Sequence, residues 1–236
     1  MHTQLAQLKM KFLSSICLVC LIAVFLSFLG ISFKNIAQES SGTVTDIDGN
    51  TYKTIQIGTQ TWMAENLRTT KLNDGTPIPL VTNDAEWSNL STPGYCWYEN
   101  NINYKSHGAI YNWHTVNTGK LCPLGWHVPS TSEWKTLIDY LGGNKVAGGK
   151  LKKVDTTLWM SPNYGATNES RFSALPNGWR NSKGIFDDLG KNAGFWSSTQ
   201  KGGIVWWMSV AYSQAAAFIM FGFNDGFGLT VRCLKD

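Results

Sequence analysis

The sequence predicts an α+β fold, made of a few short helices and short antiparallel strands in a loop-rich chain. Ser130, with Glu133 three residues later, gives the clearest helix signal, because the two side chains can satisfy each other's backbone amides. Beyond residue 170 the chain alternates short aromatic runs with Gly and Asn turns, a pattern typical of short strands. A helix first and strands afterwards indicate the α+β class.

The N-terminal segment is predicted to direct export. Residues 1–37 contain three lysines but no Asp or Glu, and residues 12–33 are almost continuously apolar. A basic stretch followed by an apolar run is the pattern of an export signal. A cleavable signal has an apolar run of about 7–15 residues, whereas about 20 residues can span a bilayer. We therefore expect a signal peptide cleaved after Ala37, with a signal anchor in the inner membrane as the alternative.

Behind this segment, a linker (residues 38–42) leads into one domain (residues 43–236). Without the three N-terminal lysines the net charge falls from +4 to +1, with 17 Lys and Arg against 16 Asp and Glu. This balance gives no basic surface for a nucleic-acid partner. About 199 residues are enough for one domain with a buried core, and all 11 tryptophans lie in this part.

Three cysteines remain in the domain: Cys96, Cys122 and Cys233. Three pairings are open, and at most one intramolecular bridge can form. In an oxidising compartment we expect the Cys122–Cys233 disulfide, which closes a loop of over a hundred residues, with Cys96 unpaired. The alternative is three buried free thiols.

The expected elements before residue 100 begin with a β-hairpin over residues 43–58. Asp48-Gly49 separates its two apolar arms, and a tight hairpin turn needs the positive φ that Asp-Gly tolerates. A second extended piece is expected over residues 61–67 and a turn over residues 73–77. Asn83, with Glu86 three residues later, predicts a short helix through Leu90.

Two helices and four strands are expected after residue 100. One helix spans residues 109–116, with Ile110, Trp113 and Val116 facing inward. The other follows Ser130 and ends at Gly142-Gly143. The strands are expected to be antiparallel and to cover residues 195–198, 204–210, 217–221 and 229–234.

Several segments resemble the Fibrobacter succinogenes major paralogous domain. They occur in the family's order, and together the resemblance covers about residues 43–236; they are residues 48–67, 108–113, 121–134, 194–199 and 231–233. The resemblance implies a secreted or surface protein of a Bacteroidetes-type bacterium, in a family with no settled activity. It also implies a C-type-lectin-like fold with its termini close together, a fold shared with the formylglycine-generating enzymes.

Catalytic and metal sites are not expected. His107, His114 and His127 lack the spacing of a metal-ligand set. The formylglycine-generating enzymes use a closely spaced cysteine pair near the C-terminus, where this chain has Cys233 alone. A degenerate relative of those enzymes stays an alternative.

A calcium cofactor stays open, although no residue is predicted as a ligand. The carbohydrate site of the C-type lectins needs an acid before Pro-Asn and a Trp before Asn-Asp. The segments 176–178 and 224–225 lack these residues. The pairs Asp46/Asp48 and Asp187-Asp188 match ordinary turn usage.

The aromatic pair Trp206-Trp207 is the candidate ligand site. Adjacent residues of a strand face opposite sides, so one ring is expected in the core and the other outside. Beside Tyr212 or Phe223, the outer ring could stack on a sugar or dock a protein. The alternative is that most of these rings fill the core of a loop-rich fold.

These observations predict a secreted or cell-surface, non-catalytic binding or structural module. Its partner is expected to be an extracellular ligand, either a glycan or a surface protein, and no nucleic acid. Contact with a membrane is expected only through residues 12–33, if they stay uncleaved. A carbohydrate-binding protein of the lectin type is the first alternative.

Overall fold

The computed structural model describes residues 42–223 and 226–236. The chain divides into two units at Glu39, and every described residue belongs to the second. The predicted export segment and most of the predicted linker therefore lie outside the described residues. Within the described ranges, no helix is both long and apolar enough to cross a membrane.

The fold is α+β, as predicted, and contains two sheets. The first sheet has five strands in the order β1-β2-β3-β13-β6, all with antiparallel neighbours. Their bounds are β1 Thr43–Thr45, β2 Thr51–Ile57, β3 Gln60–Met63, β13 Leu234–Lys235 and β6 Trp126–His127. The first and last strands of the described chain thus share one sheet.

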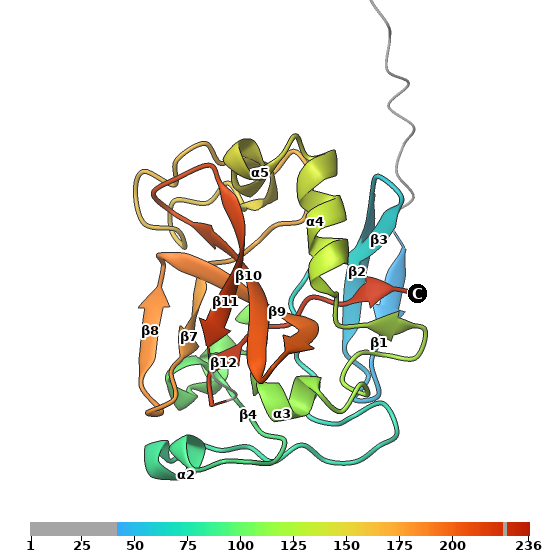
Figure 1. The fold of residues 1–236 in the computed structure, drawn as a ribbon, viewed down its shortest axis with the longest axis vertical. Helices are drawn as coiled ribbons and strands as arrows, with labels where there is room; N and C mark the ends of the chain where they lie inside the picture. The colour runs from blue at the N-terminus through green and yellow to red at the C-terminus, as the bar shows by residue number, and fades with distance from the viewer. Residues whose placement is uncertain (1–41, 224–225) are drawn as a thin grey trace, which may run out of the picture. The chain divides into compact units, whose positions relative to one another are not determined.

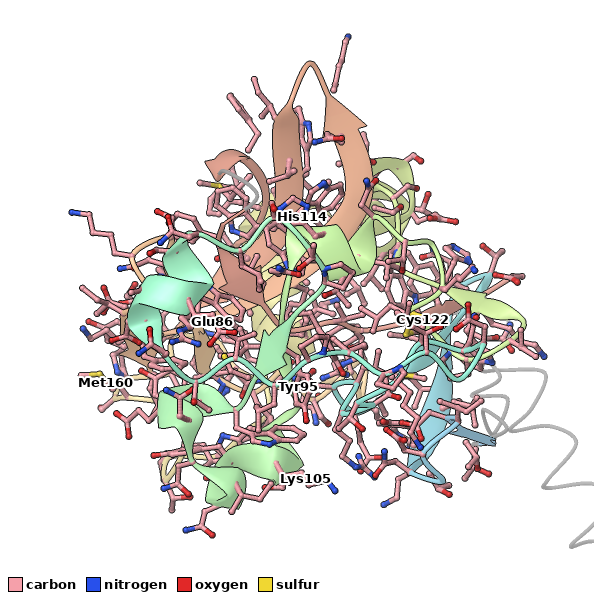
Figure 2. The ribbon with its side chains drawn as sticks, turned by 90° about the horizontal axis from the view of Figure 1, so that it is seen from below. Glu86, Tyr95, Lys105, His114, Cys122 and Met160 are labelled. Carbon is pink, nitrogen blue, oxygen red and sulfur yellow. A yellow bond between two sulfur atoms is a disulfide. The ribbon has the colours of Figure 1, made fainter. Side chains whose placement is uncertain are left out.

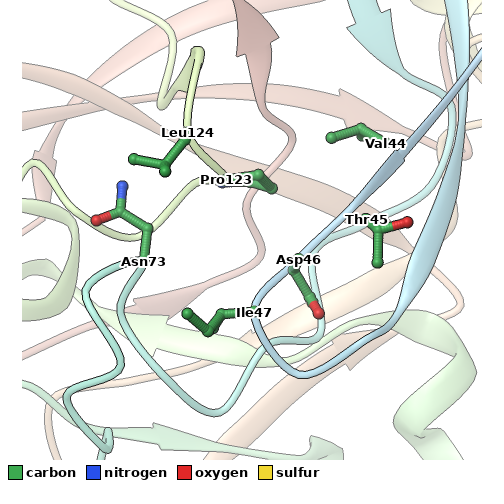
Figure 3. Close-up of a pocket in the computed structure, with 7 residues that line it drawn as sticks. All are labelled: Val44, Thr45, Asp46, Ile47, Asn73, Pro123 and Leu124. Atoms are coloured by element: carbon green, nitrogen blue, oxygen red, sulfur yellow. The ribbon is translucent and has the colours of Figure 1, made fainter.

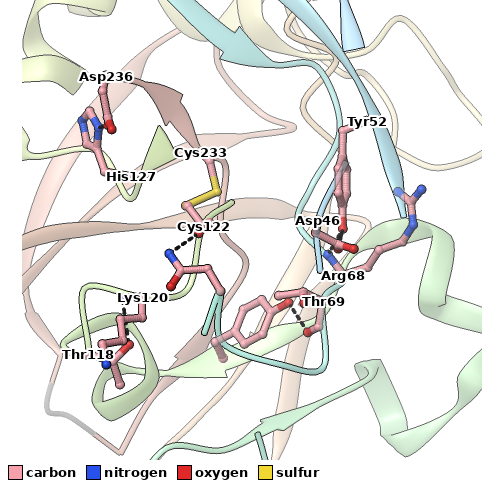
Figure 4. Close-up of a disulfide and its surroundings, with 12 residues drawn as sticks. Asp46, Tyr52, Arg68, Thr69, Thr118, Lys120, Cys122, His127, Cys233 and Asp236 are labelled. Atoms are coloured by element: carbon pink, nitrogen blue, oxygen red, sulfur yellow. Dashed lines mark hydrogen bonds and ion pairs between the residues drawn. A yellow bond between two sulfur atoms is a disulfide. The ribbon is translucent and has the colours of Figure 1, made fainter. Parts of the chain in front are cut away.

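The predicted first hairpin is confirmed, and a buried carboxylate holds its turn. Asp46 accepts hydrogen bonds from the backbone amides of Asp48 and Asn50, while Gly49 takes the positive φ of 82° that the turn needs. The Tyr52 hydroxyl donates to Asp46 at 2.5 Å and accepts from the Arg68 amide at 3.0 Å (Figure 4). The turn is thereby tied to the chain that follows β3.

The second sheet has eight strands in the order β11-β10-β9-β7-β12-β5-β4, with β8 paired to β7. Their bounds are β4 Tyr95–Cys96, β5 Ile110–Asn112, β7 Asn177–Arg180, β8 Phe186–Leu189, β9 Asn192–Lys201, β10 Ile204–Ala211, β11 Ala217–Phe223 and β12 Gly228–Leu229. The neighbours are antiparallel except β7 and β9, which run parallel where Gly178 pairs with Ala193.

The predicted strand over residues 229–234 is wrong as a single element. The chain pairs in the second sheet as β12, leaves it, and joins the first sheet as β13. Val231, Arg232 and Cys233 lie buried between the two strands. Pairing partners in two different sheets, rather than the local apolar pattern, set these bounds.

The predicted helix over residues 109–116 is also wrong in its first half. Residues 110–112 pair on both sides as β5, and only α3 (Trp113–Val116) is helical. Asn112 caps α3, because its side-chain oxygen accepts from the Thr115 amide, and the same oxygen also accepts from the Gly94 amide. His107 and His114 therefore share no helix face. Figure 2 shows His114 and Lys105, two residues before His107, on opposite sides of Tyr95.

The two helices predicted from capping signals are confirmed. α4 (Thr131–Tyr140) begins with both hydrogen bonds of the Ser130–Glu133 capping box. α2 (Asp84–Ser88) begins at the Asn83 cap but ends before Leu90. The sequence did not predict α5 (Asn144–Leu151) or the 3-10 turns Tyr98–Asn100 and Ile102–His107.

Tryptophan packing joins the two sheets through α4. Figure 1 shows α4 between β1–β3 on one side and β9–β11 on the other. The Trp134 ring centroid lies 4.7 Å from that of Trp62 on β3 and 5.9 Å from that of Phe195 on β9. All three side chains are fully buried, so burial of aromatic area fixes this arrangement.

The predicted disulfide between Cys122 and Cys233 is confirmed, and Cys96 is a buried free thiol. The bridge ties the loop before β6 to the last residue before β13 (Figure 4). Stable disulfides are typical of oxidising compartments. The bridge thus indicates an extracellular or periplasmic domain.

Candidate functional site

The predicted aromatic site residues do not form one platform. Trp207 is buried in the core at 6% exposure, whereas Trp206 is half-buried with its ring centroid 4.9 Å from that of Phe221. Tyr212 lies six residues further along, about 20 Å at the rise of a strand, and is half-buried against the core. The structure therefore brings Trp206 together with Phe221 and not with Tyr212.

Exposed apolar side chains of the β10–β11 hairpin lie on both of its faces. Cross-strand pairs share a face. Met220 therefore lies on the face of its partner Trp207, and Phe221 lies on the face of its partner Trp206. Met220 and Phe221 are 41% and 61% exposed. No single aromatic surface with convergent polar groups results.

A small cavity beside the first hairpin is also a weak candidate. Its volume is about 230 Å³, and its lining is Val44, Thr45, Asp46, Ile47, Asn73, Pro123 and Leu124 (Figure 3). Ligand pockets usually hold about 300–1,000 Å³. The Asp46 carboxylate is engaged in the turn, and the Asn73 amide donates to the Cys122 carbonyl. Little polar capacity is left for a ligand.

A second cavity, larger than that beside the first hairpin, is a groove of about 570 Å³. Residues from β2, the segment after β3, the end of the 3-10 turn Ile102–His107, the loop after α5 and the segment before β13 line it. The lining residues are Lys53, Thr54, Ile55, Ala64, Glu65, Asn66, Ser106, Lys153, Asn168, Arg171, Ser173, Leu175 and Arg232. We call this cavity the basic groove.

Four cationic side chains but only one acidic side chain line the basic groove. The side chains of Lys53 and Arg171 make no hydrogen bond or ion pair with another described residue, and both residues are exposed. Lys153 lies 3.2 Å from the Asp155 carboxylate. The acid, Glu65, accepts from the Lys53 backbone amide at 2.9 Å. The excess positive charge is notable in a domain that is almost neutral overall.

Arg232 supplies a buried positive charge at the groove. Its side chain is fully buried and donates to the Asn66 side-chain oxygen at 2.9 and 2.7 Å, and to the carbonyls of Met63 and Phe172. All of these acceptors are neutral. Burial lowers the pKa of Arg232 to about 9, and the charge of Glu65 acts in the opposite direction. No described carboxylate pairs directly with this guanidinium.

The loop after α5 presents Arg171 from a constrained backbone. Asn168, Arg171 and Ser173 have positive φ values of 49°, 58° and 55°, a region that costs energy for residues other than glycine. The Asn168 side chain bonds the amide and the hydroxyl of Ser173. Phe172 is fully buried, and its carbonyl accepts from Arg232. The loop is held from inside while Arg171 faces outward.

His107 adjoins the groove through its neighbour Ser106. The His107 carbonyl accepts from the side chains of Asn66 and Asn177 at 2.8 and 2.7 Å. Its Nδ1 atom is buried and has no hydrogen-bond partner among the described residues. Burial, assisted by the charge of Lys153, lowers the pKa of His107, so its ring is neutral at pH 7. The residue positions Asn66, which in turn positions Arg232.

The remaining candidate site residues make contacts that support the fold. His127 lies between Asp236, at 2.6 Å, and Glu133, at 3.0 Å. Asp48 accepts from the Thr70 amide and hydroxyl within the fold. Among residues 42–223 and 226–236, no group of three or more His, Cys, Asp or Glu side chains could hold a metal ion.

The sequence did not predict the basic groove. Comparison with known families shows which of the groove residues stand in family motifs. The family model of the Fibrobacter succinogenes major domain matches residues 55–235. The chain belongs to this family. The resemblance inferred from the motifs is thus confirmed. No curated protein matches the chain, and no solved structure does either.

Two family-like segments of this Fibrobacter succinogenes major domain contribute to the groove. Residues 48–67 contain Glu65 and Asn66, and residues 231–233 contain Arg232. These motifs could have indicated that the three residues lie together. Arg171 carried no comparable signal, because it stands in a loop that no motif marked.

Proposed function

We propose that this Fibrobacter succinogenes major domain is an exported, non-catalytic binding module of C-type-lectin-like architecture, and that the basic groove is its ligand site. The observation that carries this proposal is the set of unpaired outward cations mounted on a constrained framework. Lys53 lies on a strand, and Arg171 lies on a loop held by buried Phe172. Preorganised polar groups lower the entropic cost of binding.

The disulfide supports a binding role over a degenerate enzyme role. A relative of the formylglycine-generating enzymes would need a thiol pair near its C-terminus. The sulfur of Cys233 is bonded to that of Cys122, and the free thiol of Cys96 is buried. Burial raises the pKa of Cys96 to about 12, which keeps it protonated and poorly nucleophilic at pH 7.

A carbohydrate-binding role through the β10–β11 hairpin is the second candidate. Phe218 and Phe221 are 39% and 61% exposed on an edge strand. An exposed ring can stack on a sugar face or dock a protein. The two rings lie on different faces of the hairpin, so each would act separately.

An array of extracellular polysaccharides and peptides, probed with the full chain, tests the proposal. We expect binding that Ser106→Trp abolishes, because Ser106 is an exposed residue of the groove lining. Phe221→Ala, on the hairpin, is the comparison variant and should bind normally. If Phe221→Ala abolishes binding and Ser106→Trp does not, the ligand site lies on the hairpin and not in the groove. Parallel arrays with calcium and with a chelator would detect a calcium requirement, and mass spectrometry of the bound ligand would detect turnover.

A further inference from the structure

We infer that the basic groove binds an acidic glycan through the carboxylate groups of its sugar units. This inference rests on the proposed function and specifies the ligand of the same site. The lining contains Lys53, Lys153, Arg171 and Arg232 against Glu65, a local excess of three positive charges. The predicted domain (residues 43–236) as a whole has 17 Lys and Arg against 15 Asp and Glu, an excess of two, so the groove is more positive than the domain that contains it.

The three outer cations and the buried cation have different roles. Lys53 and Arg171 project from separate segments and make no hydrogen bond or ion pair with another described residue. Each side chain can therefore bind an anion without first breaking an ion pair or hydrogen bond within the described structure. A guanidinium matches a carboxylate with two parallel hydrogen bonds. Arg232 beneath them has only neutral acceptors, so a bound carboxylate would compensate a charge that the fold leaves unpaired.

The groove does not favour an acidic peptide in extended form. Peptides commonly bind by adding a strand to a free sheet edge. Lys53 already pairs with Thr43, and its carbonyl accepts from the Ala64 amide. Thr54 pairs with Met63 of the neighbouring strand and donates to the Gly42 carbonyl. The backbone of this wall is therefore occupied on both sides.

The groove also does not favour a neutral sugar. Neutral sugars are commonly held by stacking on an aromatic ring, and the lining contains no aromatic side chain. Its apolar members are Ile55, Ala64 and Leu175. The exposed Ser106 hydroxyl makes no hydrogen bond with another described residue. Charge recognition with a hydroxyl contact therefore matches a uronic acid better than a neutral hexose.

Glu65 limits where the carboxylate can bind. It is the single acid of the lining and is fixed through the Lys53 amide at 2.9 Å. The Glu65 carboxylate repels a carboxylate bound in the same groove, so the bound anion is directed toward Arg171 and away from Glu65. Glu65→Gln should therefore tighten binding of an acidic oligomer and leave binding of a neutral oligomer unchanged.

Calorimetric titration of the full chain tests the inference. The probes are oligogalacturonate, an alginate oligomer, the fully methyl-esterified oligogalacturonate, poly-glutamate and inorganic phosphate. We expect an acidic oligomer to bind and its ester to bind at least tenfold more weakly. Arg171→Ala and Lys53→Ala should each weaken binding about 1.5- to 5-fold, the range of exposed ion pairs, and high salt should weaken it further. Lys183→Ala removes an exposed lysine outside the groove and should change nothing.

Several outcomes would overturn the inference. They are equal binding of the oligomer and its ester, tighter binding of poly-glutamate or phosphate, or no binding of either acidic oligomer. A neutral glycan from the array that Ser106→Trp blocks would keep the proposed function while removing its acidic ligand. An array without any groove-dependent ligand would remove both. Thermal unfolding of each variant separates lost binding from lost folding.

Discussion

Removal of the Cys122–Cys233 disulfide should cost a large part of the domain's stability. The bridge joins residues 111 positions apart. In the chain-entropy model, closing a loop of this length removes about 4.8 kcal/mol of conformational freedom from the unfolded chain. Domains are typically stable by about 5–15 kcal/mol. The double variant Cys122→Ala/Cys233→Ala is therefore expected to unfold at much lower urea concentration.

Tryptophan fluorescence during urea unfolding is the suitable assay, because five tryptophans are fully buried: Trp62, Trp87, Trp134, Trp159 and Trp196. Cys96→Ala is the matched control, since it removes a buried thiol without removing a crosslink. It should cost about 1 kcal/mol, as an average substitution does. A reducing agent should destabilise the parent by as much as the double substitution does, and should leave the double variant unchanged. If the double variant loses no more stability than Cys96→Ala, the argument from loop length is wrong.

Three further predictions concern charge and packing. Burial lowers the pKa of His127, but hydrogen bonds to Asp236 and Glu133 outweigh it, and the net pKa is raised. The stabilisation that protonated His127 contributes to the folded state is therefore complete below about pH 6.5 and is lost as the pH rises through the folded pKa. His127→Gln should accordingly remove the fall in melting temperature over this pH range. Lys152→Met should cost about 3 kcal/mol or more in urea unfolding, because the fully buried ammonium donates to three carbonyls, each at 2.9 Å. Gly148→Ala should lower the melting temperature although alanine favours helices, because the new Cβ would lie 2.1 Å from a carbonyl oxygen of the segment before β11.

Each of these predictions has a control. His107→Gln should change the pH profile in the opposite sense, because burial and Lys153 lower the pKa of His107. Lys150→Met, in the last turn of α5 and partly exposed, should cost far less than Lys152→Met. Val146→Ala, at an exposed position of α5, should be almost neutral. A pH profile that His127→Gln leaves unaltered would contradict the reasoning. So would equal losses of stability in Lys152→Met and Lys150→Met, or in Gly148→Ala and Val146→Ala.

Short-range signals in the sequence determined several elements of this protein. The Ser130–Glu133 capping box, the Asn83 cap and the Asp48-Gly49 hairpin were all predicted and all formed. Each depends on hydrogen bonds or backbone angles within a few residues, so neighbouring residues suffice to specify it. The family motifs, which extend over most of the chain, likewise identified the domain.

Tertiary structure decided the elements whose bounds depend on distant partners. Residues 110–112 became a strand because the sheet supplies neighbours on both sides. α5 formed despite Gly148 and Gly149, because their missing side chains allow close approach to the segment before β11 and to the Gly165 carbonyl. Residues 229–234 were divided between two sheets for the same kind of reason. Packing outweighed local propensity in all three cases.

The basic groove illustrates the same division at the level of function. Lys53, Arg171 and Arg232 each look like ordinary charged residues in the sequence, and the first and last are 179 positions apart. Only the fold brings them to one cavity and buries Arg232 among neutral acceptors. The sequence by itself determined the family, the favoured disulfide and the composition of a near-neutral domain. Where its positive charge gathers was decided by tertiary structure, because charge density depends on distance in space and not along the chain.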